Sequence, residues 1–541
     1  MKRIKSLSSV LPILLLCLPA CLNDTFSDDE ASSASSVGEG GESGGSSAGE
    51  DDGWGTGEDG DPGDGDGGDS GDGDGDEAMV PDDEGAEETE TETETETETG
   101  EPLCNDVDDV ILYLSPDDSN SMSSPVQVRE RVLKDGLGIG PVAIRPWEFM
   151  NYYSFDYAPA EDGTLALSAE LRPLEGFEPE LGFQLQLAVS SEEMTDAERP
   201  PMNVTLVLDT SGSMNGEPIE LLRESCRAIA ASLRVGDKVS MVEWDTTNTW
   251  ALAGHEVDGP NDPLLLDKIE QLEAGGGTDL NGGLTSGYEL AQQTWDVNAL
   301  NRVVLISDGG ANAGLTEVDL IAENAVYGGS DGIYLVGVGV DLEGTYNDDL
   351  MDAVTDAGKG ASVFVTDEAE AWKTFNQNFV NTMGLAARNV QVELTMPPGF
   401  EIVKFSGEEF SSDPQEVEPQ HLSPNDAMVF HQQVVTCAPE LVDDAAQISV
   451  TATWEDVSTF ESVELTQTYA VGDLLAADAS RMAKGAAILA YTDALIAVKK
   501  SDESTQVAVE AAYAAIDAAE AALPGDADLA EIRMILDALT A

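Results

Sequence analysis

The stretch of this chain that most restricts its fold is residues 203–213, which read N-V-T-L-V-L-D-T-S-G-S. A mostly apolar run ends in Asp209, and Ser211 and Ser213 follow before a segment that can form a helix. Such a run is typical of a buried strand in a parallel sheet. Ligands of open α/β sheets bind beyond the carboxyl ends of the strands. One carboxylate and two hydroxyls at that place suit a hard cation such as Mg²⁺ better than zinc or a redox metal.

From residue 203 onward, predicted strands alternate with predicted helices, which indicates a parallel sheet wrapped by helices. We therefore expect a doubly wound, Rossmann-like α/β domain over residues 200–388. After the first strand, the predicted strands are residues 238–244, 249–253, 302–306, 333–340 and 362–365. The predicted helices are residues 218–233, 263–272, 281–294, 317–327, 348–357 and 368–385.

The sequence on both sides of this domain shows the period of two that is typical of half-buried strands. The two sets of strands could form one antiparallel sandwich, which would make the central domain an insertion. The aromatic-rich residues 144–157 are expected to pack in a core and not to form a sugar platform. The predicted strands are residues 110–114, 165–171 and 183–189 before the domain, with a helix at 124–137, and residues 389–396, 446–454 and 462–469 after it.

The end of the chain is rich in alanine and is predicted to form helices at residues 473–499, 504–523 and 526–539. We expect these helices to be a packing element first and a partner surface second. With 541 residues the chain is too long for one core. We divide it into a signal peptide (1–20), an acidic linker (21–103), a β-rich region (104–199), the central domain (200–388), a β-sandwich region (389–472) and a helical region (473–541).

The N-terminus has the layout of a secretory signal, with basic residues before an apolar run at residues 10–20 that is too short to span a bilayer. The run ends in L-P-A-C, which resembles a bacterial lipobox. That resemblance implies that Cys21 is acylated and becomes the first residue of the mature chain. Leu22, directly after the cysteine, favours the outer membrane by the same resemblance. An ordinary signal peptide with a chance cysteine is the alternative.

Residues 22–101 contain no Lys or Arg and end in a Thr-Glu repeat. Such a segment cannot bury enough apolar surface to offset its ordering entropy, so we expect a disordered tether. Its D-G-D run lacks the twelfth-position Glu and the flanking helices of an EF-hand, which favours loose ion condensation over a formed calcium site. The formal net charge of −82 argues against nucleic acid as a partner. It fits a cationic protein surface or divalent cations better.

Three cysteines remain if the signal is removed and Cys21 is acylated. Cys226 falls in an amphipathic predicted helix, where a small buried thiol is expected. Cys104 and Cys437 are then candidates for a disulfide between the segments that flank the central domain, because the predicted compartment is oxidising. The sequence does not fix this pairing.

Two further loops add oxygen donors to those of residues 203–213. The segment A-G-G-G-T-D-L offers Thr278, and R-V-V-L-I-S-D-G-G offers Asp308. The order D-x-S-x-S, G-G-T-D and S-D-G resembles the metal-ion-dependent adhesion site (MIDAS) of von Willebrand factor type A (VWA) domains. The sequences around these motifs are similar to those of bacterial lipid-anchored VWA proteins. In those proteins a VWA-associated region precedes the domain, and I-R-P-W-E-F-M-N-Y-Y-S-F-D-Y at residues 144–157 resembles its signature. The resemblance implies that residues 104–199 form this region.

This resemblance implies that Ser211, Ser213 and Thr278 contact Mg²⁺, or Mn²⁺ or Ca²⁺, through their hydroxyls. Asp209 and Asp308 would act directly or through water. An Asp or Glu carboxylate from a protein partner would fill the open position on the ion. The alternative is that these residues only cap loops, as Ser, Thr and Asp often do.

Enzymatic motifs do not support catalysis, since the sequence has neither a G-x-x-x-x-G-K-[ST] loop nor an H-E-x-x-H pair. His255 is predicted in a loop after an edge strand, and His421 and His431 in the sandwich region. We therefore expect a non-enzymatic, lipid-anchored protein-binding module in the cell envelope, at the outer membrane or the cell surface. The alternatives are an envelope assembly scaffold with a structural metal and, more weakly, a hydrolase with Asp279 as its base.

Overall fold

The computed structural model describes residues 104–116, 121–134, 136–174, 182–310, 332–340, 346–501 and 504–541. The predicted signal peptide, the lipobox, the acidic linker and the predicted helix at residues 317–327 lie outside these ranges. Within them, no helix combines the length and the apolar character that a membrane span requires.

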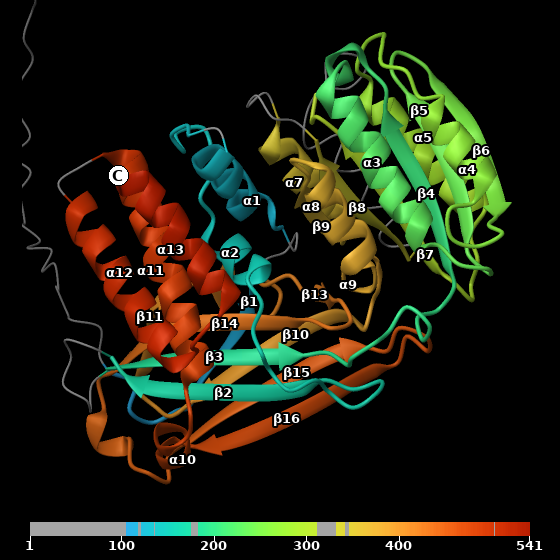
Figure 1. The fold of residues 1–541 in the computed structure, drawn as a ribbon. Coiled ribbons are helices and arrows are strands. Elements are labelled where there is room, and N and C mark those ends of the chain that lie inside the picture. Colours follow the sequence, from blue (N-terminus) through green and yellow to red (C-terminus); the bar gives the residue numbers. More distant parts are fainter. Residues whose placement is uncertain are drawn as a thin grey trace, which may run out of the picture. The chain divides into compact units, whose positions relative to one another are not determined.

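A six-stranded sheet forms the central domain (Figure 1). Its strand order is β6-β5-β4-β7-β8-β9, and each neighbouring pair is parallel except β5 and β6. Every residue of β4 is buried, because the strand has neighbours on both sides and helices on both faces. The strands are β4 Met202–Asp209, β5 Lys238–Trp244, β6 Asn248–Glu256, β7 Leu300–Ser307, β8 Ile333–Gly339 and β9 Ala361–Phe364.

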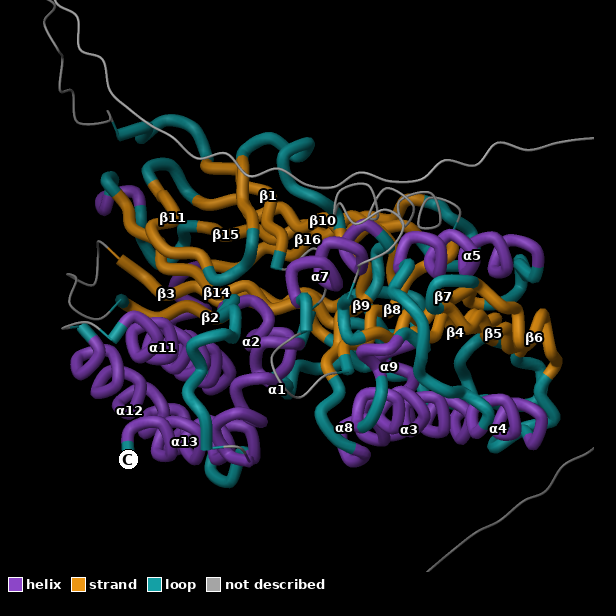
Figure 2. The backbone as a smooth tube through the Cα atoms, turned by 90° about the horizontal axis from the view of Figure 1, so that it is seen from above, coloured by secondary structure: helices purple, strands orange, loops and turns teal. Residues whose placement is uncertain are grey.

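Helices cover this sheet on both faces, as Figure 2 shows. Helices α3, α4, α8 and α9 pack on one face, and α5 and α7 pack on the other. The predicted doubly wound α/β fold is therefore confirmed, with one antiparallel edge strand. The helices are α3 Glu217–Ser232, α4 Pro263–Glu270, α5 Leu280–Gln293, α7 Asp348–Ala357, α8 Glu368–Trp372 and α9 Phe379–Met383.

The prediction of one continuous helix at residues 368–385 is wrong. A π-helical turn, η3 Lys373–Gln377, separates α8 from α9, and Asn378 leaves the helical conformation. Consecutive amide residues, N-Q-N, occupy this break. Their side chains compete with the backbone for hydrogen bonds, which weakens a helix.

The strands on the two sides of the central domain form one sandwich of two sheets. One sheet has the order β12-β1-β10-β15-β16, with β13 also paired to β10, and the other has the order β11-β14-β3-β2. Strand β1 pairs with β10, and β3 pairs with β14, so the central domain is inserted between β3 and β10. The strands are β1 Val110–Ser115, β2 Ala166–Pro173, β3 Gly182–Ser190, β10 Ala387–Met396, β11 Phe400–Phe405, β12 Glu409–Ser411, β13 Gln420–Leu422, β14 Ala427–Thr436, β15 Gln447–Glu455 and β16 Ser462–Ala470.

The strands β11, β12, β13 and β14 are absent from the sequence-based prediction. Strand β14 is the longest of them and has no clear alternation, because both of its faces are covered. Met428 and Phe430 face the core between the two sheets, whereas Val429 faces a layer of helices. A strand that is buried on both faces loses the period of two on which the prediction depended.

A layer of helices covers the outer face of the sheet that contains β3 and β14. The aromatic stretch contributes to it through Phe149, whose ring meets that of Tyr491 edge to face at 5.8 Å. Residues 144–157 therefore pack in a core, as the sequence predicts. The helices outside the central domain are α1 Ser123–Arg129, α2 Pro146–Tyr152, α10 Val471–Ala476, α11 Ser480–Lys500, α12 Thr505–Ala522 and α13 Ala527–Thr540, with the short turns η1 Glu130–Lys134 and η4 Pro439–Leu441.

Two predicted helices outside the central domain have different ends in the structure. The one predicted at residues 124–137 ends at Lys134, because Gly136 adopts a positive φ of 62° and Leu137 N bonds back to Arg131 O. The one predicted at residues 473–499 splits into α10 and α11. Asp478 causes the split locally, since its carboxylate accepts hydrogen bonds from the backbone N–H and the hydroxyl of Ser480.

A disulfide joins Cys104, which precedes β1, to Cys437, which follows β14. It therefore links the first described residues to the second half of the sandwich. Cys226 lies in α3 and is fully buried, and burial raises the pKa of its thiol to about 12. That thiol is therefore inert at neutral pH.

Candidate metal site

Asp209 is the last residue of β4, and its carboxylate is buried and fixed by hydrogen bonds to both oxygens. Oδ1 accepts from Ser211 N at 2.8 Å, and Oδ2 accepts from the hydroxyl of Ser307 at 2.7 Å. Burial raises the pKa of Asp209 to about 7, against the hydrogen bonds that lower it, and the neighbouring Asp308 adds to the rise. The site therefore holds a carboxylate that lacks a positive partner among the described residues.

The loop after β4 brings two hydroxyls together. A single 3₁₀ turn, Gly212–Met214, places Ser211 Oγ 3.0 Å from Ser213 Oγ. Ser211 is buried, whereas Ser213 is exposed. The site is therefore closed on the side of the sheet and open toward solvent.

The glycine-rich loop at residues 274–277 lies against the first loop, with Gly275 N bonded to Thr210 O at 2.7 Å. Gly276 has a φ of 83°, and a Cβ there would lie 2.6 Å from Asp245 Oδ2, so the position requires glycine. The buried Thr278 follows this loop. Asp279 caps α5 by accepting from Gly282 N at 3.0 Å. This use of its carboxylate counts against Asp279 as a general base.

The third loop follows β7 and carries Asp308, whose Oδ1 accepts from Gly310 N at 3.0 Å. A methyl group placed on Gly310 would lie 3.0 Å from Asp308 Oδ1, 3.5 Å from Thr278 Cγ2 and 3.9 Å from Ser213 Oγ. The three loops therefore converge at one point. The structure brings together all five residues that the sequence singled out, namely Asp209, Ser211, Ser213, Thr278 and Asp308.

Residues 204–311 match the family model of the von Willebrand factor type A domain. The chain contains a VWA domain. All five converging residues lie inside the matched segment.

The chain is a VWA domain protein of bacterial type. It is 25% identical over 279 residues to the uncharacterised protein YfbK of Escherichia coli, covering 50% of this chain and 48% of that one. It is 26% identical over 242 residues to the uncharacterised protein sll0103 of Synechocystis, covering 44% and 56%. The chain therefore spans about half the length of these curated relatives. A solved von Willebrand factor type A protein from Catenulispora acidiphila is 15% identical with a TM-score of 0.44, covering 71% of this chain and 91% of that one.

The donors of the VWA domain fit a hard cation, because all five offer oxygen and two of them are carboxylates. Within the described residues, no group of three or more His, Cys, Asp or Glu side chains could hold a metal. This absence is compatible with the five-donor set, because only two of its members are Asp and the other three are hydroxyls. The nitrogen and sulfur ligands that Zn²⁺ most often takes in proteins are absent from this set, which favours a harder cation.

Two residues beside the site, Ser307 and Asn347, are absent from the sequence-based prediction. The hydroxyl of Ser307 holds Asp209, and its position directly before Asp308 in the S-D-G motif was the available signal. Asn347 contacts the third loop, because a Cβ on Gly309 would lie 2.8 Å from Asn347 N. Asn347 also caps α7 by accepting from Leu350 N. No sequence pattern connects Asn347 to a site formed some forty residues earlier in the chain.

None of the three histidines lies on the loops of the VWA domain that carry the donors. The prediction of His255 in a loop is wrong, because β6 extends to Glu256, and His255 Nε2 lies 3.0 Å from Asp262 Oδ1. His421 and His431 are buried in β13 and β14. Burial lowers the pKa of His431 to about 4 and that of His421 well below its usual value.

Proposed function

We propose that this chain is a cell-envelope lipoprotein whose VWA domain binds a partner protein through a divalent cation. The observation that carries this proposal is the convergence of five oxygen donors from three loops beside Gly310. In a protein with 82 excess negative charges, a bound cation also offsets the repulsion that a partner's carboxylate would meet. We further propose that the partner presents an Asp or Glu to the ion.

The donor set explains why a partner would be needed. Ser211, Ser213 and Thr278 are neutral ligands, so Asp209 and Asp308 would balance a divalent ion without building up negative charge that repels a further carboxylate. Mg²⁺ prefers six oxygen ligands in octahedral geometry, which five side chains cannot complete. The exposed position of Ser213 supports a route from solvent to the ion. A partner's carboxylate would supply the missing oxygen.

The membrane anchor is a second part of this proposal, and it rests on Cys21 in the L-P-A-C sequence. The acidic residues 22–101 would then hold the folded part away from the membrane. Replacement Cys21→Ser should release the protein from the membrane fraction and abolish incorporation of labelled palmitate. Retention in membranes without label in that variant would refute lipid anchoring. Protease treatment of intact cells would test display at the surface.

The partner-binding test is capture from envelope extracts by the full chain with Mg²⁺ or with EDTA. We expect a captured protein that is lost with EDTA and lost with Asp209→Ala, whereas the control Asp517→Ala on the exposed side of α12 retains it. Capture that survives both treatments would contradict a metal bridge. If capture does not depend on the metal but the metal still stabilises the fold, the domain is instead an assembly scaffold with a structural ion.

A further inference from the structure

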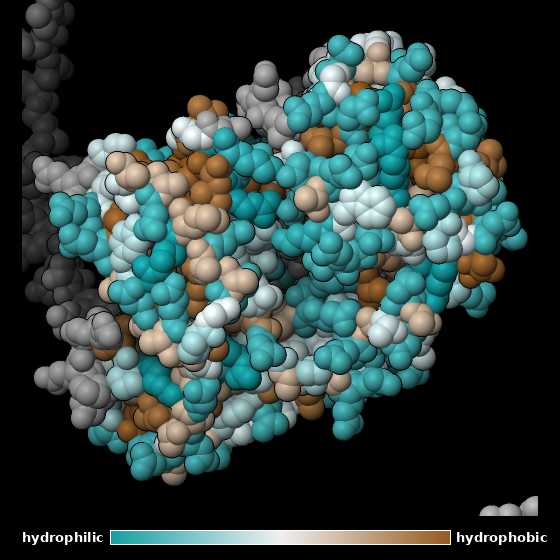
Figure 3. All heavy atoms as spheres, in the orientation of Figure 1, coloured by the Kyte–Doolittle hydropathy of each residue, from teal (hydrophilic) through white to brown (hydrophobic). Residues whose placement is uncertain are grey.

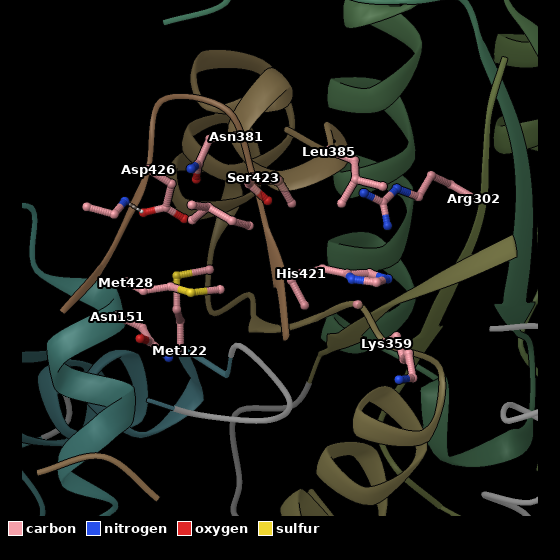
Figure 4. Close-up of a pocket in the computed structure, with 15 residues that line it drawn as sticks. Met122, Asn151, Arg302, Lys359, Asn381, Leu385, His421, Ser423, Asp426 and Met428 are labelled. Atoms are coloured by element: carbon pink, nitrogen blue, oxygen red, sulfur yellow. Dashed lines mark hydrogen bonds between the residues drawn. The ribbon is translucent and has the colours of Figure 1, made fainter. Parts of the chain in front are cut away.

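A cavity lies at the end of the VWA domain opposite to the candidate metal site, where the domain meets the sandwich. It has a volume of about 50 Å³ and is lined by Arg302 of β7, Lys359 after α7 and His421 of β13, among others. Figure 4 shows these three side chains on one side of the cavity and Asp426 on the other. Arg302 and Ser307 are five residues apart on β7, which places the cavity about 16 Å from the metal site.

Arg302 is the central group of this cavity, because its guanidinium is buried without a carboxylate partner among the described residues. The residue is 4% exposed. Nε donates to Met383 O at 3.0 Å and Nη2 donates to Gly384 O at 2.6 Å, both at the end of α9. No hydrogen bond from Nη1 is found in the described part of the chain. The two carbonyls at the end of this five-residue helix carry only partial negative charges, so they do not balance the full positive charge of the guanidinium.

Further positive charge surrounds Arg302. The guanidinium groups of Arg302 and Arg388 lie 5.5 and 5.3 Å from the ring centre of Tyr334. Arg388 donates to the Tyr334 hydroxyl at 2.6 Å, but its buried Nε has no partner in the described structure. Burial lowers the pKa of Arg302 to about 10, and Arg388 adds to this effect.

No carboxylate around the cavity pairs with Arg302 among the described residues. Glu455, opposite Arg388 in the β10–β15 pairing, accepts from Asn389 Nδ2 at 3.1 Å. Lys359 pairs with Glu418 at 3.2 Å, so that carboxylate is already engaged. Asp426 Oδ1 accepts from Ala427 N at 2.8 Å, and no ion pair joins Asp426 to Arg302 among the described residues. A buried charge without a counter-charge is strongly disfavoured. In a chain with 106 acidic residues, a surplus of positive charge at one buried place therefore calls for a counter-ion.

We propose that this cavity binds a small monovalent anion, such as chloride, between Arg302, Lys359 and His421. The volume exceeds the 10–15 Å³ or so that a single water needs, and it is large enough for an ion of that size. Because His421 Nδ1 accepts from Asn389 N at 3.1 Å, the neutral ring carries its proton on Nε2, which is then a donor. The anion would join the VWA domain to the sandwich and stabilise their contact.

The test is thermal unfolding of the full chain in potassium chloride and in potassium gluconate at equal ionic strength. Gluconate is too large for the cavity, so we expect a saturable rise of Tm in chloride only. Arg302→Gln should abolish the rise, and Lys359→Gln should raise the half-saturating chloride concentration about tenfold. Lys404→Gln is the matched control, because Lys404 is a similarly exposed lysine on β11 that pairs with Asp493 of α11 and does not line the cavity.

Line widths of ³⁵Cl in NMR spectra provide a second measurement that does not depend on unfolding. Chloride should be broadened by the wild-type chain and by Lys404→Gln, and less by Lys359→Gln. Should Arg302→Gln fail to fold, the Lys359→Gln variant still decides the matter. Equal Tm values in chloride and gluconate, or equal responses of Lys359→Gln and the control, would overturn the proposal.

Discussion

Ser307 is placed to orient the candidate metal site without contributing a ligand to it. It donates to Asp209 Oδ2 at 2.7 Å and accepts from Gly309 N at 3.0 Å, so it orients the carboxylate and the third loop together. Groups that orient metal ligands in this way typically change metal affinity 10- to 100-fold when removed.

Replacement Ser307→Ala should therefore weaken Mg²⁺ binding by about tenfold or more while the fold persists. Isothermal titration calorimetry measures the affinity, and circular dichroism checks the fold. Ser449→Ala is a suitable control, because that hydroxyl pairs with Thr468 on an exposed face of the sandwich. Unchanged Mg²⁺ affinity in Ser307→Ala would contradict this orienting role of Ser307.

His431 provides a prediction about pH. Burial lowers its pKa to about 4 from the ordinary 6.5, with Lys404 adding to the effect, and its Nδ1 lies 2.9 Å from Gln186 Oε1. Between these pH values the unfolded chain binds a proton that the folded chain does not. Stability should therefore fall as the pH falls from about 6.5 to about 4, by a few kcal/mol in total.

The variant His431→Gln should lose this part of the pH dependence, because glutamine can still donate to Gln186 and does not titrate. Urea unfolding at several pH values compares the two proteins. Parallel stability curves for the variant and the wild type between pH 4 and 6.5 would contradict a neutral buried His431.

Helix α7 connects the candidate metal site to α2, which lies between the sandwich strands β1 and β2. Its N-cap Asn347 packs against the third loop, and its first residue, Asp348, accepts from Arg145 Nη1 at 2.6 Å. Arg145 also pairs with the fully buried Glu148 at 2.8 Å. The start of α7 is therefore held from two sides.

Replacement Arg145→Ala should destabilise the protein by about 3 kcal/mol, because it leaves Glu148 buried without its positive partner. Arg533→Ala breaks more exposed pairs, to Asp517 and Glu520, and should cost less than about 1 kcal/mol. Urea unfolding midpoints compare the two. Similar midpoints for both variants would mean that the Arg145 network contributes little.

Sequence patterns predicted the elements of the VWA domain well and those of the sandwich less well, for a physical reason. The buried parallel strands read as apolar runs bounded by turns, and the start of β5 at Lys238 and of α7 at Asp348 agrees with the prediction. Strand β14 is absent from the prediction, because both of its faces are covered and its sequence has no clear alternation. The convergence of the five oxygen donors followed from three motifs, whereas the roles of Ser307 and Asn347 depend on contacts between loops that no local pattern encodes.

The VWA domain is an insertion in a sandwich that is built from two distant segments of the chain. The described surface of the domain is mainly hydrophilic in the view of Figure 3. The Cys104–Cys437 disulfide closes a loop of 333 residues that contains the entire insertion. Such a covalent link restricts the unfolded chain more than the folded one.

The double variant Cys104→Ser with Cys437→Ser should therefore lose stability, by about 2–4 kcal/mol, without losing the β1–β10 pairing. Differential scanning calorimetry measures the change, and the wild type with a reducing agent should match the variant. A Tm that is unaffected in both would show that the disulfide adds nothing to the paired strands.

The central claim is that Asp209, Ser211, Ser213, Thr278 and Asp308 hold a divalent cation. Calorimetric titration of EDTA-stripped full chain with Mg²⁺ tests it most directly, with Asp209→Ala and Asp517→Ala measured in parallel. The many other carboxylates affect all three proteins equally, so the difference isolates the site. We predict about one Mg²⁺ per chain that is absent in Asp209→Ala and present in Asp517→Ala. Identical titrations for all three proteins would contradict the account.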